Sequence, residues 1–112
     1  MLTALAIAVC PAPPTERVTC VHDGDTIIIE RERMRIVGID APELKGGCDA
    51  ESALAIRSRD RLVEILNERR VSIKRIGYDR FGRTLVEMPE ASRKLVDEGL
   101  AQVWRGRRAV WC

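Results

Sequence analysis

Apolar and polar positions alternate in two parts of the chain, and this pattern predicts β-strands there. The first part begins at Arg17 and includes the β-branched run from Thr26 to Ile29, which favours extended structure. The second part lies on both sides of a glycine-containing turn at residues 79–83. In all, strands are predicted over residues 17–22, 26–29, 34–39, 71–76 and 84–88.

Two segments show a helical pattern instead. A long helix is predicted from about residue 50 to 67, with Asp49 as its N-cap and an apolar stripe along one side. A short helix is predicted from about residue 92 to 98, with Ser92 as its cap and Gly99 at its end. This order of elements suits a mainly β fold with two helices, a five-stranded Greek-key barrel of the OB-fold type. A small, open α+β sheet is the alternative.

The first 14 residues differ in pattern from the rest of the chain. Residues 2–9 are apolar but too few to span a bilayer, and they are similar to the apolar part of a secretory signal. The prolines at positions 11, 13 and 14 then mark a linker. We therefore expect residues 1–14 to form an apolar leader and linker, and residues 15–112 to form the domain. An N-terminal strand that packs on the domain is the alternative.

Composition narrows the class of protein only slightly. The chain has 112 residues, of which 46% are hydrophobic, and this is enough for one domain with a core. A net charge of +2 says little about nucleic-acid partners. The four cysteines, at positions 10, 20, 48 and 112, lack the C-x-x-C spacing of a zinc ribbon or a redox pair. Disulfides would fit an exported protein, periplasmic or secreted.

Four acidic residues lie in turns that begin or end predicted strands, namely Asp23, Asp25, Asp40 and Glu43. Taken singly, each is explained by the tendency of acidic side chains to cap turns. A fold that brings the two turns together would place several carboxylates in one site, and such a cluster needs a cation or arginines to neutralise it. Carboxylate and carbonyl oxygens are the ligands that a hard cation such as Ca²⁺ prefers.

Arg35 is unusual because it shares a predicted strand face with the apolar residues Val37 and Ile39. It can either extend to solvent at the end of the strand or meet an anion. In a regular strand Arg35 and Asp40 would point to opposite faces. A shared site therefore needs an irregularity before Asp40, and we place it at Gly38.

Four segments of the chain resemble the staphylococcal nuclease (thermonuclease) family in sequence, order and spacing. They are Asp23 to Thr26 (DGDT), Arg35 to Glu43 (RIVGIDAPE), Asp79 to Leu85 (DRFGRTL) and Leu95 to Ala101 (LVDEGLA). The resemblance covers roughly residues 18–104. It implies an OB-fold and Ca²⁺-dependent hydrolysis of phosphodiester bonds in DNA or RNA. We expect single-stranded nucleic acid to be the preferred substrate, and we expect a monomer without a membrane span.

The resemblance also assigns residues to the metal and to the base. Asp25 and Asp40 would bind the metal through their carboxylates, and Ala41 would bind it through its main-chain carbonyl. Glu43 occupies the position of the general base, which orients or deprotonates the attacking water.

A second set of positions would contact the substrate. Arg35 and Arg83 match the two arginines that hold the reacting phosphate, and the planar fork of arginine suits two phosphate oxygens at once. Arg80 can meet a terminal phosphate, and Phe81 can stack on or near the nucleotide. Trp104 is a further candidate for stacking on a base.

The chain also departs from the family. The loop from Leu44 to Asp49 is short, and we expect the C-terminal helix of the family to be absent. A small domain with less packing often gains a cross-link, so we hypothesise a disulfide between Cys48 and Cys112, with Cys20 as the alternative partner.

Two other functions remain open beside an active nuclease. One is a non-catalytic OB-fold module that binds single-stranded nucleic acid. The other is a structural or protein-binding domain in which the acidic turns are only caps. The presence of all the acidic and arginine positions favours catalysis over both.

Overall fold

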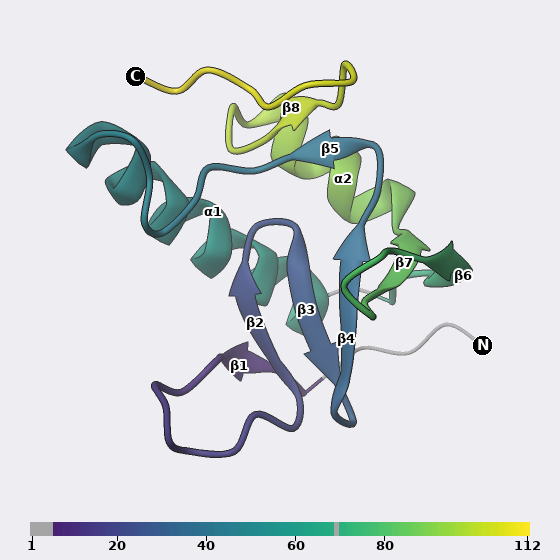
Figure 1. Cartoon of the computed structure of the whole chain (residues 1–112). Helices are drawn as coiled ribbons and strands as arrows, with labels where there is room; N and C mark the ends of the chain where they lie inside the picture. The colour runs from purple at the N-terminus through teal and green to yellow at the C-terminus, as the bar shows by residue number, and fades with distance from the viewer. Residues whose placement is uncertain (1–5, 69) are drawn as a thin grey trace.

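Six strands form an open sheet in the order β1-β2-β3-β4-β7-β6 in the computed structural model, which describes residues 6–68 and 70–112 (Figure 1). A separate pair of short strands, β5 and β8, lies beside it. Two helices complete the mixed α/β domain. The strands are β1 (Ala8–Val9), β2 (Cys20–Asp23), β3 (Thr26–Ile29), β4 (Glu32–Ile36), β5 (Ile39–Asp40), β6 (Lys74–Tyr78), β7 (Thr84–Glu87) and β8 (Gln102–Val103), and the helices are α1 (Asp49–Glu68) and α2 (Pro89–Asp97).

The centre of the sheet is built from neighbours in sequence. Strands β2, β3 and β4 pair antiparallel, and the tip between β3 and β4 is made by Glu30 and Arg31, both with positive φ. Strand β7 then pairs parallel with β4 and antiparallel with β6. This arrangement brings the turn after β2 and the chain that follows β4 to the same end of the sheet (Figure 1).

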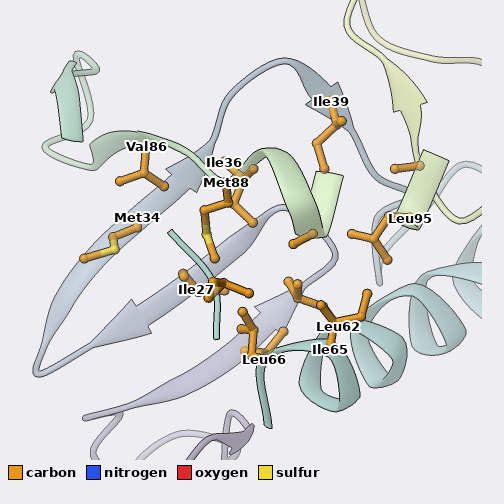
Figure 2. Packing of buried hydrophobic residues seen from close by; sticks show 14 of the residues in the cluster. Ile27, Met34, Ile36, Ile39, Leu62, Ile65, Leu66, Val86, Met88 and Leu95 are labelled. Carbon is orange, nitrogen blue, oxygen red and sulfur yellow. The ribbon is translucent and has the colours of Figure 1, made fainter. Parts of the chain in front are cut away.

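One apolar core joins the sheet to both helices (Figure 2). Helix α1 contributes Leu62, Ile65 and Leu66, and these side chains recur at the spacing of one helical face. Burying one such side chain contributes about 1.5–3 kcal/mol, so the core holds α1 firmly against the sheet. The other large buried side chains include Val21, Ile27, Met34, Ile36, Val86, Met88 and Leu95. Neither described helix is long and apolar enough to cross a membrane.

The segment before β2 packs on the domain. Ile7 is 6% exposed and exchanges two hydrogen bonds with the side chain of Asn67 in α1, of 2.9 and 2.7 Å. Strand β1 pairs with β2, and a disulfide joins Cys10 to Cys20. This is the packed N-terminal strand that the sequence pattern left open. Residues 1–5 of the expected leader lie outside the described residues, and a domain boundary at residue 14 stays a prediction.

Several predicted boundaries differ from the observed ones. The short helix starts at Pro89, and Ser92 donates its backbone N–H to Met88 O (2.9 Å), so Ser92 lies inside the helix and is not its cap. Proline fits the first helical turn because it has no N–H to lose there. The strand expected over residues 34–39 is divided, because the backbone changes direction at Gly38, where φ is +87°. The irregularity expected at Gly38 is thus a break between β4 and β5.

Candidate active site

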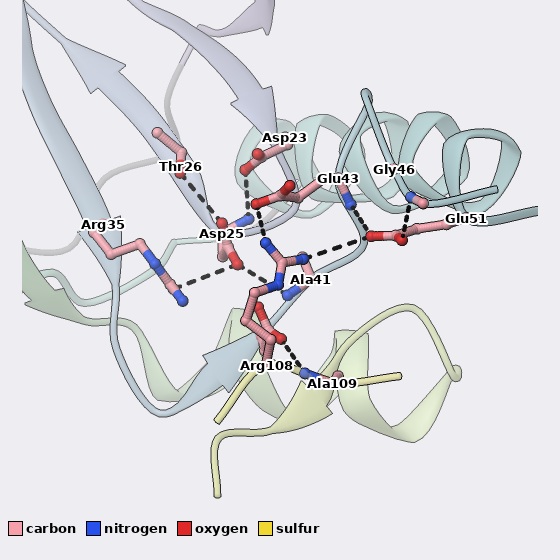
Figure 3. Close-up of polar contacts among 12 residues, drawn as sticks. Asp23, Asp25, Thr26, Arg35, Ala41, Glu43, Gly46, Glu51, Arg108 and Ala109 are labelled. Atoms are coloured by element: carbon pink, nitrogen blue, oxygen red, sulfur yellow. Dashed lines mark hydrogen bonds and ion pairs between the residues drawn. The ribbon is translucent and has the colours of Figure 1, made fainter. Parts of the chain in front are cut away.

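The two acidic turns meet at one end of the sheet (Figure 3). Asp25 is 7% exposed, and its Oδ2 accepts a hydrogen bond of 2.9 Å from the backbone N–H of Ala41. Its other carboxylate oxygen accepts one of 3.2 Å from the hydroxyl of Thr26. Asp40, the residue before Ala41, is 6% exposed. Asp25, Asp40 and the main chain of Ala41, the three expected metal ligands, are therefore neighbours.

The ionised form of Asp25 is disfavoured by its surroundings. Burial and the nearby carboxylate of Asp23 raise its pKa to about 7, although Arg35 opposes the shift. A bound cation would favour the ionised form, which is the physical reason to expect one here.

The described residues contain no group of three or more His, Cys, Asp or Glu side chains arranged to hold a metal. A Ca²⁺ ion, which takes six to eight oxygen ligands, would fit with Asp25, Asp40 and the Ala41 carbonyl only if water or substrate oxygens supplied the rest.

Arg35, in β4, contacts Asp25 from the sheet. Its guanidinium lies 3.4 Å from Asp25 Oδ2, and it also donates to the backbone carbonyls of Ile36 and Ile39 on both sides of Gly38. The break at Gly38 thus brings the Arg35 guanidinium against Asp25 and against the carbonyl of Ile39, the residue before Asp40. A site shared by Arg35 and Asp40 stays a prediction. Most of the Arg35 fork is already used within the chain, which limits how many phosphate oxygens it can meet without rearranging.

Glycine is required at position 24, between the two aspartates, because the turn packs against α1. A Cβ atom at Gly24 would lie 2.0 Å from Ser58 Oγ and 2.9 Å from the Cβ of Ala41. We expect Gly24→Ala to lower the free energy of unfolding by about 1–3 kcal/mol, as overpacking does, in a chemical denaturation experiment.

A second substitution separates this contact from other effects of alanine. Ser58 Oγ is buried and has no hydrogen-bond partner among the described residues, so Ser58→Ala should be nearly neutral alone. In that background Gly24→Ala should cost less. An equal cost in both backgrounds would show that the contact with Ser58 is not the cause.

Glu43 lies at the open side of the site, where it is paired with Arg108. The side chains are 51% and 52% exposed, so the pair is largely in water. Exposed ion pairs contribute only about 0–1 kcal/mol to stability. The pair can therefore open at little cost when another charged group arrives.

Glu51, in the first turn of α1, contacts both the backbone of Glu43 and the side chain of Arg108. The sequence did not identify it as a site residue. It is 6% exposed, and its carboxylate accepts the backbone N–H groups of Glu43 and Gly47, each at 3.0 Å. These two bonds, with Arg108 at 3.6 Å, lower the pKa of Glu51, so it stays ionised. From sequence Glu51 had the ordinary role of an acidic residue near a helix N-terminus.

The segment after β8 runs over the acidic residues. The backbone N–H of Ala109 donates to Asp40 Oδ2 at 2.6 Å, and Cys112 forms a disulfide with Cys48 just before α1. The cross-link hypothesised from sequence is thus present in the structure, together with the Cys10–Cys20 bond that was not expected. All four cysteines are paired.

The expected substrate-contacting residues line one pocket of about 330 Å³ next to Arg35. Asp79, which also lines this pocket, holds the loop that follows it. Its carboxylate accepts hydrogen bonds of 2.9 Å from the backbone N–H groups of Phe81 and Arg83, and one of 2.7 Å from the Arg83 side chain. The guanidinium of Arg80 lies 5.0 Å from the centre of the Phe81 ring, within the range of a cation–π contact. The residues of the sequence prediction that line this pocket are Arg35, Arg80, Phe81, Arg83 and Trp104.

A larger groove, of about 780 Å³, lies on the other side of Glu43 and Arg83. Its basic members are Arg17, Arg33, Lys45 and Arg83, and His22 also faces it. Burial, with the neighbouring Arg17, lowers the pKa of His22. The groove also contains the acidic side chains of Asp23 and Glu43, and it shares Arg83 with the smaller pocket.

Two buried carboxylates, Asp25 and Asp40, and several arginine side chains thus lie at one end of a small mixed α/β domain. The family model described as "Staphylococcal nuclease homologue" matches residues 33–110, which is more than half of the chain. The protein belongs to this family, which confirms the resemblance found in the sequence. The match contains three of the four segments, and the segment from Asp23 to Thr26 precedes it.

The chain is also similar to a curated protein over most of its length. Protein ParB of Escherichia coli is 33% identical over 129 residues, an alignment that covers 95% of this chain and 70% of ParB. The similarity extends to the N-terminal part of the chain that precedes the family match, so the whole domain has a counterpart in that relative.

Proposed function

We propose that the protein is a Ca²⁺-dependent nuclease that hydrolyses phosphodiester bonds of DNA or RNA. The observation that carries this proposal is the corner where buried Asp25 contacts both Arg35 and the main chain of Ala41, the residue after buried Asp40, with Glu43 at its open side. A purely structural pair of caps would not need two buried acids, one of them with a pKa near 7. Family membership supports the same chemistry.

Each residue has a role that its surroundings support. Glu43, half exposed, would orient a water molecule and take its proton as the water oxygen attacks phosphorus. Arg35 and Arg83 would offset the negative charge that grows on the phosphate oxygens as the ester P–O bond breaks. The leaving oxygen would then take a proton from solvent. When bound by Asp25, Asp40 and the Ala41 carbonyl, Ca²⁺ would supply further charge stabilisation.

We also propose that the domain has the barrel fold of its family and that the protein lies outside the cytoplasm. The two sheets would correspond to the five-stranded barrel of the family with β1 as an addition. The two disulfides support an extracytoplasmic location, because such bonds persist in oxidising compartments.

The pocket of about 330 Å³ that contains Phe81 and Trp104 would hold the base next to the scissile phosphate. Phe81 is 61% exposed and Trp104 44% exposed, which leaves ring surface for stacking. A stacked base is worth about 1–3 kcal/mol, so we expect Phe81→Ala or Trp104→Ala to raise KM about 5–100-fold on a single-stranded oligonucleotide. The matched control is Tyr78→Ala, an exposed aromatic residue that does not line this pocket. Equal effects at Tyr78 would remove the pocket from substrate binding.

Hydrolysis of labelled single-stranded DNA and RNA, with Ca²⁺ or with a chelator, tests the proposal directly. We expect cleavage with Ca²⁺ and its loss on chelation, under oxidising conditions that keep both disulfides. Oligonucleotide binding without any Ca²⁺-dependent cleavage would replace the nuclease by the non-catalytic binding module.

A further inference from the structure

Among the guanidinium groups at the acidic corner, that of Arg108 is the most available to a ligand. Arg35 is 19% exposed and is engaged by Asp25 and two carbonyls. Arg83 is 29% exposed and is engaged by Asp79. Arg108 is 52% exposed, and its partner Glu43 is 51% exposed. A fork with five N–H donors that uses only part of them, in water, can accept a second anion readily.

The position of Arg108 is nevertheless set by the structure. Glu51, buried and fixed by two backbone N–H groups, lies 3.6 Å from the Arg108 guanidinium (Figure 3). The next residue, Ala109, is bonded to Asp40, and the Cys48–Cys112 disulfide ties the end of the same segment to the start of α1. The main chain that follows Arg108 is thus held, while the tip of its side chain remains accessible.

The excess of negative charge around Asp25 and Glu43 would repel a phosphodiester unless a cation offset it. Five carboxylates gather here, and Arg35 and Arg108 are the cations in contact with them in the described structure; the carboxylates are those of Asp23, Asp25, Asp40, Glu43 and Glu51. A phosphodiester that approaches Glu43 would meet an anion unless a cation lies beside it. The guanidinium of Arg108 lies at that place, where it donates to Oε1 of Glu43.

We propose that Arg108 is a third phosphate-binding arginine: it exchanges Glu43 for the substrate phosphate and so frees the base, and Glu51 and the Cys48–Cys112 disulfide position it. The inference rests on the proposed nuclease function and adds a residue that none of the four family-like segments contains. The neutral N–H of Ala109 bonds only one oxygen of Asp40 and leaves the charge of Asp40 available.

Binding of a fluorescein-labelled oligothymidylate, measured by anisotropy with EDTA at a series of salt concentrations, tests Arg108 independently of cleavage. We expect Arg108→Ala to weaken binding about 10–100-fold, as loss of a charge-assisted contact does. We expect it also to lower the slope of log K against log salt by about 0.7, the value for one phosphate contact on a single strand. Arg108→Lys should keep the slope and recover only part of the affinity, because it keeps the charge but not the fork.

Arg107→Ala is the matched control, since Arg107 is an exposed arginine of the same segment. It should change the slope less than Arg108→Ala does. Thermal melting of each variant establishes that it is folded. Unchanged binding in Arg108→Ala, an equal effect in Arg107→Ala, or no salt-dependent binding by the wild type would each overturn the proposal.

The role of the disulfide is tested by a double-mutant cycle on cleavage with Ca²⁺. The variant Cys48→Ser with Cys112→Ser should lower kcat/KM, and Arg108→Ala should cost less in that background than in the wild type, because residues that act together are not additive. The variant Cys10→Ser with Cys20→Ser is the control and should leave the effect of Arg108 intact. A rise in activity when Cys48 and Cys112 are replaced would instead make the segment an inhibitory lid and would overturn the proposal.

Wild-type behaviour distinguishes failure of this inference from failure of the nuclease itself. A protein that cleaves nothing but binds the oligonucleotide through Arg108 would contradict the nuclease alone. A protein that cleaves normally with Arg108→Ala would contradict only the role of Arg108.

Discussion

Glu43→Gln is expected to lower the rate of Ca²⁺-dependent hydrolysis about 10²–10⁴-fold, the usual contribution of a positioned general base. Glutamine keeps the shape of the side chain and an oxygen that can accept a hydrogen bond from Arg108, but it cannot take a proton from water. The loss should therefore fall on kcat, with little change in the affinity for an oligonucleotide. Single-turnover cleavage assays, with binding measured separately, give the two quantities.

The control for this substitution is Glu87→Gln, which removes an exposed carboxylate at the end of β7. It should leave kcat unchanged. If Glu43→Gln cleaved at the wild-type rate, the water would have to be activated by another group, and the role given to Glu43 would be wrong.

The second large effect is a dependence of stability on pH that comes from Asp25. Its pKa is about 7 in the folded protein and 3.8 as the ordinary value. Between these values the folded protein keeps a proton that the unfolded chain has released, so a rise in pH favours unfolding. The stabilising contribution is complete below pH 3.8 and is lost as the pH rises through about 7. We expect a slope on the order of 1 kcal/mol per pH unit in the metal-free protein.

Asp25→Asn isolates this contribution, because the difference in unfolding free energy between the two proteins cancels other titrating groups. His22 is one such group, since its lowered pKa gives the opposite slope below its ordinary value of 6.5. Added Ca²⁺ should stabilise the wild type most at the higher pH and should have a much smaller effect on Asp25→Asn. Parallel stability curves for the two proteins between pH 4 and 7 would contradict the assignment. Urea denaturation at each pH provides the measurement.

Local sequence patterns predicted those parts of the fold whose contacts are local. The hairpins around Asp23-Gly24-Asp25 and Glu30, and the apolar face of α1, follow from alternation, turn residues and helical spacing. The strand parity of Arg35 and Asp40 was enough to place an irregularity at Gly38 before the backbone angle there was known. The start of α2 was misplaced because a serine is a strong cap signal, whereas the actual start uses Pro89.

The acidic residues of the site were also accessible from sequence, because they lie in turns and match a family. Arg108 and Glu51 were not, since each had a satisfactory local explanation, a basic run for one and a helix terminus for the other. Arg108 owes its role to contacts with Glu43, 65 positions away, and with Glu51, and no local pattern contains them. Glu51 accepts N–H groups from residues only eight and four positions away, but a helix terminus alone does not reveal that the loop before it bonds there. The hypothesised Cys48–Cys112 bond was the one sequence feature that pointed to this connection.

The long-range contacts of the segment after β8 also bear on the order of folding. Arg108 is 65 residues from Glu43, and Ala109 is 69 residues from Asp40, whereas the β3–β4 hairpin closes within ten residues. Contacts between distant residues form slowly because a long loop must close before any contact compensates the lost entropy. We therefore expect the β2–β3–β4 hairpins and α1 to form first, and the active site to be completed last, when this segment docks and the second disulfide closes.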